Sequence, residues 1–231
     1  MKRSEVNAVM KSGDEFAKAN KFYLPPFAYW SPSDWKHKGD EVSEIVNMKM
    51  GWDITDWGSG NFQKLGLFMF TIRNGSHKFL KDLSGKIYAE KLLIVDRDQL
   101  TPMHYHWTKM EDIINRGGGD LCLRLHNSTP ENGLADSPVT VSIDGVRRTF
   151  SPGEVVTLHR GESITLTQGL YHEFWGEKEK VLVIEVSVCN DDDTDNQFYD
   201  TIGRFPLIEE DEEPLHLLLK DYPKYYQSGV A

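Results

Sequence analysis

The segment at residues 139–158, "VTVSIDGVRRTFSPGEVVTL", contains three short runs of β-branched and alternating residues, separated by two turn signals. Asp144-Gly145 lies between the first two runs, and this dipeptide is a strong signal for a two-residue β-hairpin. Pro152-Gly153 separates the second run from the third, and both residue types favour turns. The segment therefore predicts three consecutive strands, the first two joined by a hairpin.

The same pattern continues on both sides of this segment. From about residue 64, similar runs such as "LGLFMFTIRNG" (65–75) and "KVLVIEVSVCND" (180–191) recur at roughly one strand per ten residues. Short, evenly spaced strands between turn signals are typical of all-β sandwiches and barrels. We therefore predict a mainly all-β fold, with helices near the N-terminus and a short helical extension near the C-terminus.

The flanking regions differ from this β-rich region. Residues 4–19 carry apolar side chains at helical spacing, and Gly13 suggests a break into two short helices. The next segment is rich in Pro and aromatic residues, which predicts a wrap over a core. We expect a single domain over the whole chain, with an N-terminal wrap at 1–60, a barrel core at 61–190 and a C-terminal extension at 191–231.

Composition narrows the classes of function. A chain of 231 residues with 39% hydrophobic and 27% charged residues is ordinary for one globular domain. The net charge of -10 argues against nucleic acid and anionic membranes as partners. Cys122 and Cys189 form no CxxC pattern, which predicts reduced thiols. Without an apolar signal segment or a long apolar run, a cytoplasmic protein is the expectation.

A concentration of possible metal ligands lies in "TPMHYHWTKMED" (101–112). His104 and His106 are one residue apart, and side chains at i and i+2 of a strand point to the same face. Lys109 and Glu111 repeat this relation. Imidazole together with carboxylate suits divalent first-row metals. The segment therefore predicts a metal site at the end of a strand.

Together with "GESITLTQGLYHEFWG" (161–176), this segment resembles the double motif of the cupin family. The matching positions of the two motifs are His104, His106, Glu111 and Gly118, then Gly161, Thr167 in place of the usual proline, Gly169 and His172. Asp98 and Gly176 depart from the pattern at positions that supply no ligand. The resemblance implies a jelly-roll barrel (a double-stranded β-helix) with His104, His106, Glu111 and His172 as the metal ligands.

Longer stretches are similar to one cupin family, the D-lyxose isomerases. They are "EKLLIVDRDQLTPMHYHWTKMEDIINRGGGDL" (90–121), "EVSVCNDDDTDN" (185–196) and "GRFPLIEEDEEP" (203–214). The resemblance implies an intramolecular oxidoreductase, an aldose–ketose isomerase that converts D-lyxose to D-xylulose and D-mannose to D-fructose. It implies Mn²⁺, with Co²⁺, Zn²⁺ or Fe²⁺ as alternatives, and a homodimer. The preferred sugar, among D-lyxose, D-mannose and L-ribose, stays open.

The implied reaction moves a proton between C1 and C2 through a cis-enediolate, so it needs a general base and a group that stabilises the oxyanion. Glu185 is the candidate base, because it is a lone carboxylate in the apolar strand "VLVIEVSV". Lys109, close to the metal motif, is the candidate partner for the oxyanion. Asp192 or Asp195 is expected to bind distal hydroxyl groups. Arg204 is expected either to close over the sugar or to form a structural ion pair.

The three glycines at 117–119 follow the metal motif. No Lys-Ser/Thr pair follows them, so they do not form a phosphate-binding loop. Glycine permits a positive φ angle and close backbone approach. We predict a tight turn that leads into a strand at 120–125.

Three other functions are compatible with a cupin site. A cupin dioxygenase would use Fe(II) on the same ligands and consume O₂, whereas a non-enzymatic sugar-binding cupin would not need Glu185 or Lys109. An isomerase of phosphorylated sugars would need a basic cluster, and Arg147, Arg148 and Arg160 are scattered. We therefore expect the isomerase of free sugars.

Overall fold

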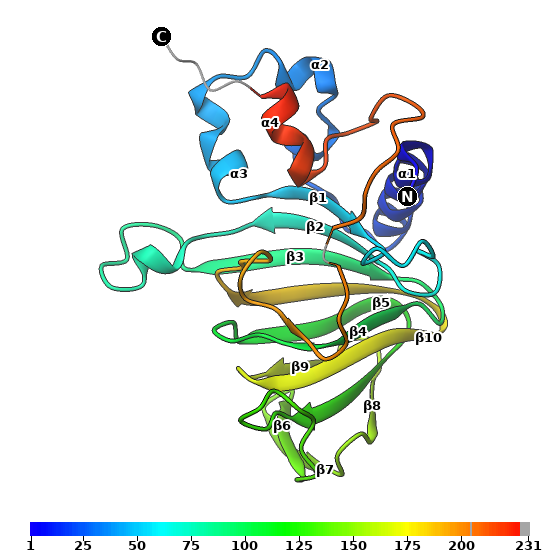
Figure 1. Cartoon of the computed structure of the whole chain (residues 1–231), viewed down its shortest axis with the longest axis vertical. Coiled ribbons are helices and arrows are strands. Elements are labelled where there is room, and N and C mark those ends of the chain that lie inside the picture. Colours follow the sequence, from blue (N-terminus) through cyan, green and yellow to red (C-terminus); the bar gives the residue numbers. More distant parts are fainter. Residues whose placement is uncertain (204, 227–231) are drawn as a thin grey trace.

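The computed structural model describes residues 1–203 and 205–226, and it confirms the mainly β fold with N-terminal helices (Figure 1). The strands are β1 (Gly51–Thr55), β2 (Leu67–Arg73), β3 (Tyr88–Val95), β4 (Leu100–Tyr105), β5 (Glu111–Asn127), β6 (Val139–Ile143), β7 (Val146–Phe150), β8 (Val155–Leu158), β9 (Ser163–Leu166), β10 (Leu170–Val188) and β11 (Gln197–Phe198). The α-helices are α1 (Arg3–Ala19), α2 (Pro32–Trp35), α3 (Ser43–Asn47) and α4 (Tyr222–Tyr225), with 3₁₀ turns at Pro26–Tyr29, Asp40–Val42, His77–Phe79 and Leu219–Asp221.

Two long antiparallel strands, β5 and β10, hold the barrel together. They pair with each other along most of their length, while each changes its other neighbour halfway. The first part of β5 pairs with β9 and the second part with β8. In β10, residues 172–175 pair with β4 and residues 181–188 pair with β3. The two strands therefore belong to two layers, which close over a common interior.

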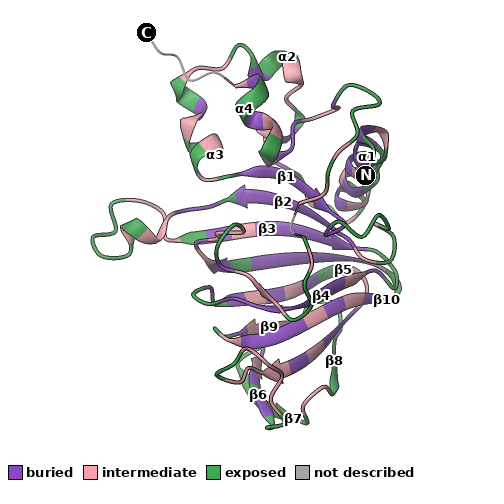
Figure 2. Ribbon diagram, viewed as in Figure 1, coloured by how far each residue is buried: buried purple, intermediate pink, exposed green. Residues whose placement is uncertain are grey.

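The interior between these layers is apolar. Alternate residues of the strands face inward, as the period of two requires. The buried cluster includes Leu93, Val95, Ile113, Leu121, Leu123, Val141, Val156, Ile164, Val181 and Val183. Figure 2 shows the buried positions concentrated along the strands. Burial of this apolar surface is the main stabilising contribution to the barrel.

The glycine run does not form the predicted turn between two strands. Residues 117–119 lie inside β5, where the strand changes its neighbour from β9 to β8 and its register with β10 shifts. Gly118 has φ +84°, and a Cβ atom there would lie 2.0 Å from the carbonyl oxygen of Lys180. The glycines therefore allow one strand to bend tightly against β10 and continue.

The hairpin at 144–145 is confirmed. β6 and β7 pair with Ile143 opposite Val146, and both turn residues have positive φ angles, 49° for Asp144 and 81° for Gly145. Positive φ at both central residues is the requirement of a type I′ turn. The local sequence therefore sets the register of this pair.

The predicted N-terminal helix is confirmed, but the predicted break at Gly13 is wrong. α1 is continuous from Arg3 to Ala19. A Cβ atom at Gly13 would lie 2.3 Å from the ring of Phe68 on β2. Glycine therefore serves close packing of the helix on the sheet here, which outweighs its low helix propensity.

α1 covers the outer face of β1–β3, where it buries a second apolar cluster that includes Val6, Met10, Trp52 and Phe70. The C-terminal segment closes the same end of the molecule (Figure 1). Arg3 is 1% exposed and pairs with Glu210 and Asp221. Sheet pairing begins at β1, inside the segment expected to wrap the core.

The described residues include no helix long and apolar enough to span a membrane. Both cysteines are buried free thiols, and burial raises the pKa of each. Their reduced state stays a prediction, which burial as separate thiols supports.

Candidate active site

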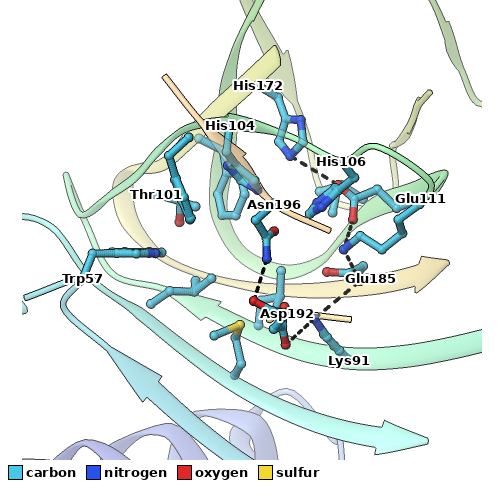
Figure 3. A pocket seen from close by; sticks show the side chains of 17 residues that line it. Trp57, Lys91, Thr101, His104, His106, Glu111, His172, Glu185, Asp192 and Asn196 are labelled. Carbon is cyan, nitrogen blue, oxygen red and sulfur yellow. Dashed lines mark hydrogen bonds and ion pairs between the residues drawn. The ribbon is translucent and has the colours of Figure 1, made fainter. Parts of the chain in front are cut away.

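Three histidine side chains from two paired strands meet inside the barrel. His104 lies on β4, His106 follows directly after β4, and His172 lies on β10 opposite His104 in the register. One ring nitrogen from each lies within 4.8 Å of the other two. All three residues are buried. The strand spacing and the cross-strand pair therefore bring the three predicted histidines to one point (Figure 3).

A backbone carbonyl fixes the orientation of each ring. The Nδ1 atoms of His104, His106 and His172 lie 2.7, 2.8 and 3.0 Å from the carbonyl oxygens of Pro102, Asp195 and Leu170. Donation from Nδ1 leaves Nε2 as a lone-pair donor, which is the arrangement of metal-ligating histidines. Burial, and then the neighbouring histidines, lower the pKa of His104 well below its ordinary value, so its imidazole is neutral.

Glu111, the first residue of β5, joins this group. Its Oε1 atom lies 3.5 Å from Nε2 of His106 and 3.2 Å from Nε2 of His172. Burial raises the pKa of Glu111, but the neighbouring Lys109 ammonium outweighs it and holds the pKa well below its ordinary value. A buried carboxylate oxygen therefore faces the same point as the imidazole lone pairs.

This set of donors fits a divalent cation. Neutral Nε2 atoms and a carboxylate oxygen directed at one buried point repel each other unless a cation lies between them. Three imidazoles and one carboxylate are ligands that first-row transition metals accept. The described residues contain one such group of three or more close ligands, and it is this one.

The two candidate catalytic residues are in direct contact beside this group. Lys109 follows β4 and is only 3% exposed, and its Nζ lies 2.6 Å from Glu111 Oε2 and 2.9 Å from Glu185 Oε1. Glu185 faces inward from β10 and also accepts a hydrogen bond from Ser187. Burial lowers the pKa of Lys109, but the two carboxylates outweigh it and hold the pKa above its ordinary value. Lys109 is therefore a fixed ammonium group next to Glu185.

A second buried lysine was not predicted. Lys91 of β3 is directly opposite Glu185 in the register, and its Nζ lies 3.9 Å from Glu185 Oε1 and 3.3 Å from Asp192 Oδ1. It also donates to the side chain of Asn190. A lone lysine in the apolar strand "YAEKLLIV" is the same signal that identified Glu185, so the sequence did contain it.

The three residues expected to bind substrate differ in their placement. Asp192 lines the pocket. The carboxylate of Asp195 accepts from the backbone N–H groups of Thr108 and Lys109, at 2.7 and 2.9 Å, and so holds the loop that carries Lys109. Arg204 lies outside the described residues.

The site opens into a pocket that the histidines and Glu111 share with residues of the neighbouring strands. Its catalytic side carries the histidines, Glu111, Lys109 and Glu185, and its other walls are Trp57, Leu67, Met69, Lys91, Leu93, Thr101, Ile113, Phe174, Asp192, Asn196 and Phe198. Figure 3 shows Trp57 and Thr101 across the pocket from Glu111. Apolar walls with a few polar groups are usual for small-ligand sites.

Comparison with known proteins finds relatives along almost the whole chain. The family model of D-lyxose isomerase matches residues 1–222. The D-lyxose/D-mannose isomerase of Serratia proteamaculans is 45% identical over 228 residues, which are 97% of this chain and 99% of that protein. The protein of the same name from Escherichia coli O157:H7 is also 45% identical, over 97% of this chain and all of its own length.

Solved structures with the same fold include L-ribose isomerases. Those of Cellulomonas parahominis and of Acinetobacter sp. DL28 (in complex with L-ribose) superpose with TM-scores of 0.61 and 0.60. They are 17% and 15% identical, and each comparison covers 90% of this chain and 98% of the other. At this identity the likeness concerns the fold. The family match over residues 1–222 and the two relatives at 45% identity, by contrast, concern the sequence of the chain. They show that this chain belongs to the D-lyxose isomerase family.

Proposed function

We propose that this protein is a metal-dependent aldose–ketose isomerase that interconverts D-lyxose with D-xylulose and D-mannose with D-fructose. The observation that carries the proposal is the contact of Lys109 with both Glu111 and Glu185, because it joins a metal-binding group to a possible general base. The family and its two relatives named for D-lyxose and D-mannose support the choice of substrates.

His104, His106, Glu111 and His172 would hold the metal, and Mn²⁺ is our proposal for its identity. When bound, the cation would act as a Lewis acid that stabilises negative charge on the sugar oxygens at C1 and C2. Co²⁺, Zn²⁺ and Fe²⁺ suit the same donors. Metal analysis of the protein as purified, together with activity after reconstitution with each ion, tests this choice.

Glu185 is the proposed general base. Its carboxylate takes the proton from C2 of the open-chain aldose and returns it to C1, while the hydroxyl proton of O2 passes to O1, which gives the ketose through a cis-enediolate. Lys109 remains protonated beside it and stabilises the oxyanion that forms on the sugar. Lys91 holds Glu185 and Asp192 from the other side. We propose Asp192 as the carboxylate that binds sugar hydroxyl groups, and Asp195 as the residue that positions the loop.

The rival functions have less support. Glu185 and Lys109 have no role in a site that only binds sugar, and a dioxygenase needs no such base. The lysines that line the described part of the pocket, Lys91 and Lys109, are both paired with carboxylates. A phosphate group would therefore find no free cation there, and Arg147 and Arg148 lie on the exposed strand β7.

The test is to strip the metal, add back Mn²⁺, and assay ketose formation from D-lyxose, D-mannose and L-ribose without O₂. We expect D-xylulose and D-fructose only after Mn²⁺ is restored. Formation of neither ketose, or a strict requirement for O₂, would overturn the proposal. The homodimer also stays a prediction, and sedimentation analysis of the full chain measures it.

A further inference from the structure

We propose that Thr101 and Trp57 form a subsite for the distal end of the sugar, the end that distinguishes a hexose from a pentose. The inference rests on the proposed function and adds to it the residues that set chain-length preference. It depends on two groups in the wall of the catalytic pocket: the Thr101 hydroxyl, which is buried without a hydrogen-bond partner among the described residues, and the Trp57 side chain, which is held on an unusual backbone conformation.

Thr101, on β4, is the first of these groups. It is 1% exposed, and its hydroxyl oxygen is buried without a hydrogen-bond partner among residues 1–203 and 205–226. Buried hydroxyl groups are nearly always paired, so an unpaired one needs an explanation such as a water molecule or a ligand. Thr101 lines the pocket, and Figure 3 shows its side chain directed toward the Trp57 side. A sugar hydroxyl is the partner that this position fits.

Trp57 is the second group. It lies in the loop after β1, is 5% exposed and lines the pocket. Its φ angle is 49°, a left-handed conformation that is rare for a large side chain. Thr55 Oγ1 accepts from the Trp57 backbone N–H at 3.0 Å, and Asp56 accepts from Gly58 and Gly60. Unfavourable backbone conformations are retained mainly where function needs them.

The position of the pair suggests which part of the sugar it meets. Catalysis requires C1 and C2 beside Glu185, Lys109 and the histidines. Thr101 and Trp57 lie across the pocket from Glu111 (Figure 3). A chain with its first two carbons at the catalytic residues therefore extends its last carbons toward this side. The indole face can pack against the C–H groups there, while its N–H and the Thr101 hydroxyl bind hydroxyl groups.

The two proposed substrates differ only at this end. D-lyxose and D-mannose have the same configuration at C2, C3 and C4, and D-mannose has one further CHOH group before its terminal CH₂OH. Discrimination between them therefore has to arise where the chain ends. A hydroxyl group held by Thr101 favours the hexose, because only the longer chain reaches it.

The experiment compares Thr101→Val, which keeps the shape and removes the hydroxyl, with wild type loaded with Mn²⁺. We expect kcat/KM for D-mannose to fall about fivefold to tenfold, as for the loss of one hydrogen bond, and kcat/KM for D-lyxose to change less than about twofold. Trp57→Phe, which keeps a ring and removes the N–H, should shift the ratio in the same direction. Thr140→Val makes the same change at an exposed position of β6 and should leave the ratio unchanged.

Calorimetric binding of the corresponding polyols gives a readout without turnover. Thr101→Val should weaken D-mannitol by a similar factor and leave D-arabinitol, the polyol of D-lyxose, within about twofold. An unchanged ratio in both variants, with wild type active, overturns the subsite alone. An equal loss for both sugars also overturns it, because Thr101 would then bind the shared part of the chain. A wild type inactive on both sugars overturns the proposed function instead.

Discussion

Glu185→Gln removes the proposed general base with almost no change in shape. An amide does not take up a proton from carbon, so the variant should lose the contribution of general-base catalysis, about 10²–10⁴-fold in kcat. This corresponds to about 3–5 kcal/mol in the activation barrier. The fold should persist, since each neighbouring lysine keeps a carboxylate. Lys109 still has Glu111 at 2.6 Å, and Lys91 still has Asp192 at 3.3 Å.

The assay measures ketose formation from D-lyxose with metal content and melting temperature determined on the same sample. We expect full metal occupancy and a melting temperature within a few degrees of wild type, because Glu185 is not among the proposed ligands. Glu173→Gln is the matched control, since Glu173 lies on the same strand and pairs with Arg124 outside the pocket lining. A Glu185→Gln variant with full metal and a kcat within tenfold of wild type would refute the proposed role.

The other predictions concern the metal and the stability of the fold. A chelator should abolish ketose formation and lower the melting temperature, and Mn²⁺ should restore both; activity that survives complete metal loss would contradict this. Gly118→Ala should lower the free energy of unfolding by at least about 1–3 kcal/mol in urea titrations, because Gly118 has φ +84° and a Cβ atom there would contact the carbonyl oxygen of Lys180. An unchanged free energy of unfolding would contradict this and show that the bend of β5 at Gly118 can relax. Arg3→Ala should cost about 3 kcal/mol, the lower end for a broken buried pair, because Glu210 is partly exposed; a change below 1 kcal/mol would contradict this. Burial lowers the pKa of His104, so below pH ~6.5 the metal-free folded protein binds fewer protons than the unfolded chain. Its stability should then fall with decreasing pH, by up to ~1.4 kcal/mol per unit; a stability independent of pH between 5 and 6.5 would be inconsistent with a neutral His104.

Sequence patterns predicted those parts of the site that depend on local spacing. His104 and His106 share one strand face, and the motif around His172 supplied the third imidazole, now opposite His104 on β10. The lone Glu185 in an apolar strand was a correct signal of burial. Such features follow from the period of two of a strand and from the low frequency of charges in apolar runs.

Features that depend on contacts between distant parts of the chain were harder to predict from the sequence. The glycine run at 117–119 suggests a turn, because nothing in the local sequence shows that β5 continues through its bend at these glycines to pair with β8. Trp57 and Thr101 come from separate parts of the chain, and no spacing rule brings them to one pocket. The role of Asp195 depends on contacts across 86 and 87 positions, with Lys109 and Thr108.

Isotope analysis shows whether Glu185 moves a proton between C2 and C1 of the sugar. D-lyxose carrying deuterium at C2 is converted without O₂ by the Mn²⁺-loaded protein in ordinary water, and the D-xylulose is examined by NMR. We expect D-xylulose to form and at least part of it to carry solvent hydrogen at C1 in place of deuterium, because the protonated carboxyl group of Glu185 exchanges with water. Complete transfer of deuterium from C2 to C1 would indicate a hydride shift, and it would contradict proton transfer through Glu185, as would the absence of D-xylulose.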